Sequence, residues 1–322
     1  MKALSDIRHR YGKAFLLLAG IVFFSANGLY FLEVPVSEAN TVADKSFSFD
    51  FDNLPDASRL KVNAKSAFLV NYANGKVLFA KNPDAPRPIA SITKLVTAMV
   101  VLDHKVDLTK PETITKEDAR NSSRSRLRAG YQLSVLDLLY AALLNSDNRA
   151  ARALARTTCG TTEAFVKEMN DKVKKLGLRN TVFYEPTGLD SRNVSTAQEV
   201  AMMLHHAYEY DLIRQITSEK SRVCRLLNRK NKYVRMANTN DIVGSKYRVL
   251  SGKTGYIQES GYCLTTMVQN VKGEKLTCVV LGVPGNNLRF REARRLVDWG
   301  FGRVGGVTTT TTASNSRPVR RP

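Results

Sequence analysis

Short runs rich in β-branched and aromatic residues lie near both ends of the chain and predict β-strands. Residues 67–72 and 76–80 flank Asn74-Gly75, and an Asn-Gly pair between two such runs is a strong signal of a tight hairpin. Three further strands are expected at 247–250, just before Ser251-Gly252, at 262–268 and at 276–283. The pattern therefore predicts that both ends of the chain contribute strands.

The middle of the chain has apolar residues at helical spacing. Ser91 is predicted as the first residue of an amphipathic helix, whose apolar positions are Ile92, Leu95, Val96, Met99 and Val100. Ser134 followed by Asp137 predicts a capped start of another helix, and an alanine-rich helix is expected after Asn148. A last helix is expected from about residue 287 to 299, ending at Gly300. Strands at both ends of a helical middle predict one α/β domain with an antiparallel sheet.

The first residues of the chain have the layout of an export signal. Lys2, Arg8, Arg10 and Lys13 precede the uncharged apolar run 14–32. Ser37 and Ala39 fit a cleavage site after Ala39, and Ala26 is a second candidate. An uncleaved membrane anchor is an open alternative. We expect residues 1–39 to be the signal or anchor, 40–56 a linker, 57–305 the catalytic domain and 306–322 a disordered basic tail. The domain is therefore expected outside the cytoplasm, with membrane contact only through the N-terminal segment.

The formal net charge of +20 narrows the choice of partner for the 322-residue chain. The basic residues are spread along the chain without an aromatic-interleaved nucleic-acid motif, so a nucleic-acid partner is not expected. Acidic polymers of the cell envelope fit an exported basic protein better. The densest basic stretch, 220–235, is interpreted as a solvated surface segment.

Four cysteines stand without a C-x-x-C pair or a nearby histidine at zinc spacing, so we expect neither a metal site nor a cofactor. Export would permit disulfides, and the sequence leaves their pairing open. Cys263 and Cys278 lie in strand-like apolar runs, where buried free thiols are expected.

Three short motifs occur in order: Ser91-Ile92-Thr93-Lys94, Ser146-Asp147-Asn148 and Lys253-Thr254-Gly255. Each alone is common, but the three together fall at predicted element edges, namely a helix start, an interhelical loop and the beginning of a strand. Their combination points to one catalytic centre.

The chemistry of nucleophilic catalysis explains these residue types. Ser91 needs a neighbouring base, and Lys94 lies one helical turn away on the same face. Lys94 acts as a base only when neutral, and burial beside a second cation, Lys253, would lower its pKa in that direction. Ser146 is expected to relay the proton to a leaving amine, and Asn148 to offer its amide to a substrate peptide.

Binding of the substrate is expected at the third motif. Lys253 and Thr254 are predicted to hold a terminal carboxylate from an edge strand. Gly255 belongs to the same substrate-binding segment, and the backbone N–H of Tyr256 is the expected second oxyanion donor.

The three motifs resemble those of penicillin-binding proteins and β-lactamases. The surrounding residues 88–94, 185–189, 238–240 and 261–264 resemble the low-molecular-weight penicillin-binding proteins, the D-alanyl-D-alanine carboxypeptidases and endopeptidases. The resemblance covers about residues 60–300 and implies a serine-transferase α/β fold with a five-stranded antiparallel sheet. It also implies that peptidoglycan stem peptides are substrates and that β-lactam antibiotics acylate Ser91.

Two alternatives to a peptidase stay open. A class A β-lactamase shares the Ser146-Asp147-Asn148 form, but the Glu-x-x-Leu-Asn segment expected of that class is missing between the second and third motifs. A wall-binding protein without catalysis is the other alternative, and the intact motifs argue against it. The residues after Gly255 resemble the endopeptidase branch, in which Tyr256 would favour a bulky leaving amine.

Overall fold

The computed structural model describes residues 18–25, 28–35, 47–122 and 125–304. The chain divides into two compact units, 1–46 and 47–322. In the first unit, β1 (Leu18–Ser25) and β2 (Gly28–Pro35) form an antiparallel pair. Among the described helices none is long and apolar enough to cross a membrane. The assignment of residues 1–39 to a signal or an anchor stays a prediction, and the predicted tail lies outside the described residues.

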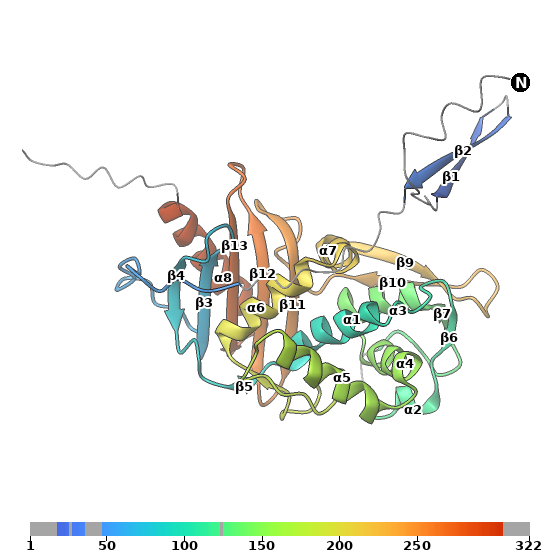
Figure 1. Ribbon diagram of the computed structural model, residues 1–322, viewed down its shortest axis with the longest axis horizontal. Coiled ribbons are helices and arrows are strands. Elements are labelled where there is room, and N and C mark those ends of the chain that lie inside the picture. The colour runs from blue at the N-terminus through green and yellow to red at the C-terminus, as the bar shows by residue number, and fades with distance from the viewer. Residues whose placement is uncertain (1–17, 26–27, 36–46, 123–124, 305–322) are drawn as a thin grey trace, which may run out of the picture. The chain divides into compact units, whose positions relative to one another are not determined.

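A five-stranded antiparallel sheet forms the centre of the second unit, in the strand order β11-β12-β13-β3-β4 (Figure 1). The strands are β3 (Ser66–Asn71), β4 (Val77–Lys81), β11 (Arg248–Ile257), β12 (Gly261–Gln269) and β13 (Lys275–Val283). The N-terminal hairpin and the C-terminal strands meet where β3 pairs with β13. The predicted sheet is therefore confirmed, with β11 on one edge.

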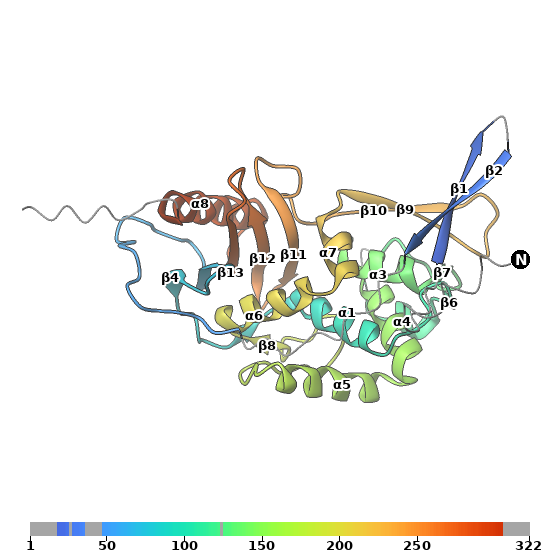
Figure 2. The ribbon, with the colours of Figure 1, turned by 45° about the horizontal axis from the view of Figure 1, so that its top comes forward.

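Each face of the sheet is covered by helices, and alternate residues of the strands pack into two separate cores. Phe68 and Val70 of β3 belong to the larger core, whereas Ala67 and Leu69 belong to the smaller one. The smaller core lies under α8 (Asn286–Val304), and α6 (Ala197–Tyr208) packs on the opposite face, as Figure 2 shows. Because successive side chains of a strand point to opposite faces of the sheet, each strand contributes apolar residues to both cores.

The helical middle surrounds α1 (Lys94–Asp103), most of whose side chains are buried. The remaining helices are α2 (Lys116–Ala119), α3 (Val135–Leu143), α4 (Asn148–Cys159), α5 (Thr162–Lys175) and α7 (Asp211–Ser218). Three small antiparallel pairs accompany them: β5 (Arg87–Pro88) with β8 (Val194–Ser195), β6 (Pro111–Thr113) with β7 (Gln132–Ser134), and β9 (Ser221–Arg225) with β10 (Tyr233–Ala237). The Ser134 cap is confirmed, because its hydroxyl accepts the Asp137 N–H. The basic stretch 220–235 forms most of the β9–β10 hairpin.

Residues 47–56, expected as linker, partly pack on the domain. The Phe49 ring meets Phe68 edge to face at 4.9 Å between centroids. The backbone of Asp50 forms an isolated parallel β-bridge with that of Lys76, beside the β3–β4 turn. All four cysteines are free, and Cys263 and Cys278 are buried as expected.

Two predicted boundaries are wrong at the C-terminal side. The strand predicted at 247–250 continues as β11 through the third motif to Ile257, with a register shift after Val249, so this motif lies within a strand and not at its beginning. The helix predicted to end at Gly300 continues to Val304. Gly300 serves close packing instead, since a Cβ there would lie 2.5 Å from Leu69 Cδ2 and 3.0 Å from Leu276 Cδ1.

This packing predicts opposite effects of alanine at two glycines of α8. Gly300→Ala gains about 1 kcal/mol of helix propensity but overpacks the core, so we expect a net loss of about 1–2 kcal/mol in the free energy of unfolding. Gly302→Ala meets nothing within 4 Å and is expected to be neutral or slightly stabilising. Urea unfolding of both variants measures the difference; a Gly300→Ala protein as stable as Gly302→Ala would contradict it.

Candidate active site

Ser91 lies in a tight turn just before α1, not at the first position of the α-helix. Residues Ala90–Thr93 form a 3₁₀ helix, and α1 begins at Lys94. Ala90 has a left-handed φ of 48°, and the Thr93 hydroxyl donates to the Ala90 carbonyl at 2.8 Å. The left-handed backbone at Ala90 is incompatible with a right-handed α-helix at that residue, so the regular α-helix begins only at Lys94, whose N–H donates to the Ile92 and Ser91 carbonyls.

Two glycines let other segments approach the Ser91 backbone. A Cβ at Gly188, which has φ +82°, would lie 2.0 Å from the Ala90 carbonyl oxygen. A Cβ at Gly255 of β11 would lie 2.7 Å from the Ile89 carbonyl oxygen and 3.1 Å from the Ser91 nitrogen. The nucleophile is therefore clamped between a loop and the edge strand.

The Lys94 amine is fully buried beneath Ser91 and has three oxygen neighbours. Its Nζ lies 2.9 Å from Ser91 Oγ, 2.7 Å from Asn148 Oδ1 and 2.6 Å from the Thr187 carbonyl oxygen. A neutral amine has two N–H groups and one lone pair. Asn148 Oδ1 and the Thr187 carbonyl can only accept, so the lone pair is left to receive the Ser91 proton.

Burial lowers the pKa of Lys94 to about 8, against the raising effect of the Glu185 and Asp147 carboxylates. Arg152 adds to this lowering. The repulsion between the buried Lys94 and Lys253 amines, which the sequence predicted, acts on both members of the pair and lowers the pKa of Lys253. A substantial fraction of Lys94 is therefore neutral near physiological pH, as a general base requires.

The second and third motifs meet on the other side of Ser91. Lys253 Nζ donates to Ser146 Oγ at 2.8 Å and to the Thr254 carbonyl at 2.9 Å. Ser146 adopts a left-handed φ of 58°, and the Thr254 hydroxyl lies 2.6 Å from the Thr239 hydroxyl. Burial lowers the pKa of Lys253 well below its usual value, with Lys94 and Arg289 adding to the effect.

These groups line one cleft of about 490 Å³. Its walls include the predicted residues Ser91, Ser146, Asn148, Thr254, Gly255 and Tyr256. Lys94 and Lys253 lie buried next to it. The Tyr256 side chain is 46% exposed and stacks on Tyr262, with 4.2 Å between ring centroids. The structure thus brings together all eight predicted site residues.

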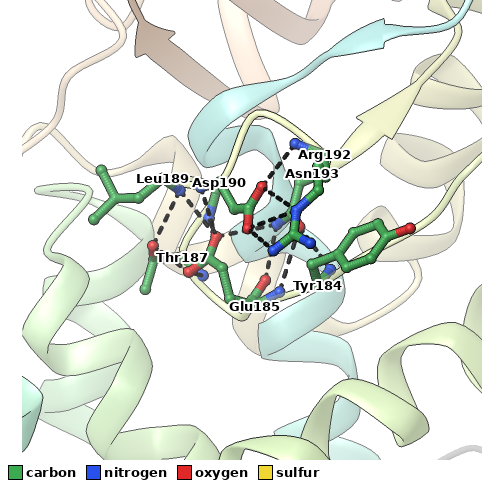
Figure 3. Close-up of polar contacts among 8 residues, drawn as sticks. Tyr184, Glu185, Thr187, Leu189, Asp190, Arg192 and Asn193 are labelled. Atoms are coloured by element: carbon green, nitrogen blue, oxygen red, sulfur yellow. Dashed lines mark hydrogen bonds and ion pairs between the residues drawn. The ribbon is translucent and has the colours of Figure 1, made fainter.

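A loop that the three motifs did not include holds the Thr187 carbonyl on Lys94. Figure 3 shows the polar contacts within this loop. The Glu185 carboxylate accepts the backbone N–H groups of Thr187 at 2.8 Å, Leu189 at 2.9 Å and Gly188, and also the Thr187 hydroxyl at 2.5 Å. Asn193 Nδ2 donates to the same carboxylate at 3.1 Å. Glu185 is therefore the internal hub of this loop.

The loop is also fastened to the helix that carries Lys94. Thr97 of α1 donates its hydroxyl to the Pro186 carbonyl at 2.7 Å. Asn193 Nδ2 donates to the Thr93 hydroxyl at 3.3 Å. Glu185 therefore acts as a positioning residue for Lys94.

The supporting roles of Asp147 and Arg289 were also missing from the sequence interpretation. Asp147 caps α4 by accepting the Arg149 N–H at 2.9 Å, and its other oxygen accepts the Ser125 hydroxyl at 2.6 Å. Arg289 of α8 donates to the Gly255 carbonyl of β11 at 3.0 Å and also lines the cleft at Ser91. Of these roles, only the capping of α4 by Asp147 could have been predicted from the sequence, because Asp is a preferred residue at the N-cap of a helix.

The D-alanyl-D-alanine carboxypeptidase family matches residues 53–285 of the chain. The chain belongs to this family. It is 39% identical to a D-alanyl-D-alanine endopeptidase of Pseudomonas aeruginosa, over 80% of this chain and 82% of that protein. It is 32% identical to the D-alanyl-D-alanine carboxypeptidase DacF of Bacillus subtilis, over 76% of this chain and 64% of that protein.

A similar fold is known from experiment. The crystal structure of the Streptomyces K15 DD-transpeptidase matches with a TM-score of 0.71 and 27% identity, over 75% of this chain and 98% of that one. The serine-transferase fold expected from the sequence is therefore confirmed.

The Glu185 loop predicts a shift in the pH dependence of acylation by penicillin. In the wild type we expect the rate to rise with pH around the Lys94 pKa of about 8. Glu185→Gln removes a charge that raises this pKa, so the midpoint should move down by about half to one pH unit. The plateau rate should also fall, because an amide cannot accept the same set of N–H donors.

Glu163→Gln is the matched control, since Glu163 lies exposed in the first turn of α5. It should change neither the midpoint nor the plateau. An unchanged profile in Glu185→Gln, or a midpoint at higher pH, would contradict the positioning role.

Proposed function

We propose that this protein is a serine peptidase that cleaves D-alanyl peptide bonds of peptidoglycan through an acyl-enzyme on Ser91. The observation that carries the proposal is the buried Lys94 amine 2.9 Å from Ser91 Oγ, held by two groups that only accept hydrogen bonds. Membership of the D-alanyl-D-alanine carboxypeptidase family supports the choice of substrate.

In the acylation step neutral Lys94 takes the Ser91 proton while Oγ attacks the D-alanyl carbonyl carbon. The negative oxygen that develops is stabilised by the backbone N–H groups of Ser91 and Tyr256. The C–N bond then breaks, and the proton held by Lys94 returns to the leaving amine through the Ser146 hydroxyl. In deacylation water gives a proton to Lys94 and attacks the acyl carbon. The ester C–O bond then breaks, and Lys94 returns the proton to Ser91 Oγ, which restores the serine and the neutral amine.

Lys253 and Thr254 bind the carboxylate of the substrate in this proposal. The pKa of Lys253 is lowered by burial in the free protein. An arriving carboxylate favours the charged form of the amine, so binding and charging of Lys253 are coupled. Asn148 holds Lys94 through its side-chain oxygen, which leaves its NH₂ group for the substrate peptide.

The finer proposal is that cross-linked stem peptides are cleaved at least as well as terminal D-alanine is released. Tyr256 supports it, because its half-exposed ring at the cleft offers contact area to a bulky leaving amine. The higher identity to a relative named endopeptidase, of which the chain covers more, points the same way. We also propose an exported location in the cell envelope and covalent inhibition by β-lactams.

Defined muropeptides test both levels of this proposal. Purified wild-type protein should cleave a cross-linked dimer at least as fast as it releases D-alanine from a monomeric pentapeptide. Ser91→Ala should be inactive on both substrates, since it removes the nucleophile. Products are separated and identified by chromatography with mass detection.

Each outcome bears on a different level of the proposal. Release of D-alanine without dimer cleavage would overturn the endopeptidase preference and leave the peptidase assignment. Cleavage undiminished in Ser91→Ala would overturn the assignment of the nucleophile. Rapid penicillin turnover without peptide cleavage would favour the β-lactamase alternative.

A further inference from the structure

A second cleft, of about 810 Å³, opens at the other end of the strand that carries the third motif. It lies among α7, the residues before β11, and the ends of β12 and β13 that adjoin them. None of its lining residues lines the cleft at Ser91. The principal side chains that line it are Tyr208, Arg214, Lys220, Tyr247, Arg248 and Lys275.

The charges of this second cleft are strongly unbalanced. Four of its lining residues are cationic, and Asp211 is the one acidic residue among them. Asp211 already pairs with Arg214. Within the part of the chain that the structure describes, Lys220, Arg248 and Lys275 form no ion pair with a carboxylate. Three positive groups therefore share a concave surface without a protein counterion.

Local contacts hold two of these cations in place. The Lys275 ammonium lies over the rings of Tyr72 at 5.4 Å and Tyr208 at 5.8 Å from the centroids. Gly244 has φ +88°, and a Cβ there would lie 2.4 Å from Lys220 Cε, so the loop backbone fits closely against the lysine side chain. Holding the cations before a ligand arrives lowers the entropy cost of binding.

β11 connects this cleft to the reactive one. Arg248 is the first residue of β11, and Thr254 follows in the same strand. At about 3.3 Å per residue the two lie about 20 Å apart along the strand. One polymer carrying repeated acidic peptides could therefore occupy both clefts at once.

We propose that this cleft binds carboxylate groups of a second stem peptide of the polymer whose peptide bond is cleaved at Ser91. The inference rests on the proposed function for its choice of polymer. An arginine fork and two ammonium groups match carboxylates in charge and in hydrogen-bond donors. Occupation of this cleft would raise affinity for the wall polymer by holding it at a second point.

Sedimentation with purified sacculi, stripped of attached phosphate polymers, tests the proposal. The parent protein is Ser91→Ala, so that binding is measured without turnover. Adding Lys220→Gln and Arg248→Gln should weaken binding about tenfold, by removing two ion pairs with the polymer. Sacculi whose carboxylates have been amidated should bind the parent at least as weakly as untreated sacculi bind this variant, because amidation also removes the carboxylates that Lys253 and Thr254 would hold.

The matched control adds Lys116→Gln and Lys174→Gln, which remove the same charge from exposed positions on α2 and α5. Binding equal to the parent is expected. Equal weakening in the cleft variant and in the control variant would show a general effect of charge and would overturn the proposal that the second cleft is a binding site. Full binding by the cleft variant, or full binding to amidated sacculi, would overturn it as well.

Penicillin acylation separates this test from that of the proposed function. With Ser91 restored, both double variants should acylate at the wild-type rate, because these lysines and Arg248 lie outside the reactive cleft. Loss of acylation in every protein, wild type included, would refute the proposed chemistry and leave the sedimentation result intact.

Discussion

The site depends on a lysine amine that is buried without a carboxylate partner directly beneath a serine hydroxyl. Removing Lys94 from water disfavours its charged form. Among the described residues, the neighbours of its amine that can only accept are Asn148 Oδ1 and the Thr187 carbonyl oxygen. These two contacts use the two N–H groups of a neutral amine and direct its lone pair at Ser91. The same burial that would destabilise an ordinary lysine thus makes this one a base.

Distant parts of the chain are needed to build that environment. The 3₁₀ turn places Ser91 above Lys94, α4 supplies Asn148, and the Glu185 loop supplies the Thr187 carbonyl. β11 closes the other side, where Gly255 permits contact with the Ser91 backbone. Because each support comes from a different element, the base forms only when the helical region and the sheet edge are packed together.

The sequence predicted the parts with local signals and missed those made by tertiary approach. The hairpin at Asn74-Gly75, the Ser134 cap and the three motifs each follow from short-range chemistry, and the structure contains them all. The Ser91 turn departs from a regular helix because the backbone of Ala90 is left-handed, a conformation that no spacing of apolar residues predicts. The sequence singled out residues 185–189 only by their resemblance to a family and gave Glu185 no role. The contact of this loop with Lys94 and the grouping of cations in the second cleft join residues far apart along the chain, so no local pattern predicts them.

The ionisation of Lys94 is the property on which the account stands, and lysine-selective NMR measures it directly. Titration of the wild type, with the Lys94 signal assigned by its loss in Lys94→Arg, should give a pKa of about 8. The signal should therefore change within the range where the exposed lysines remain charged. A pKa at or above the ordinary 10.5 would show a permanent ammonium beneath Ser91 and would contradict the account.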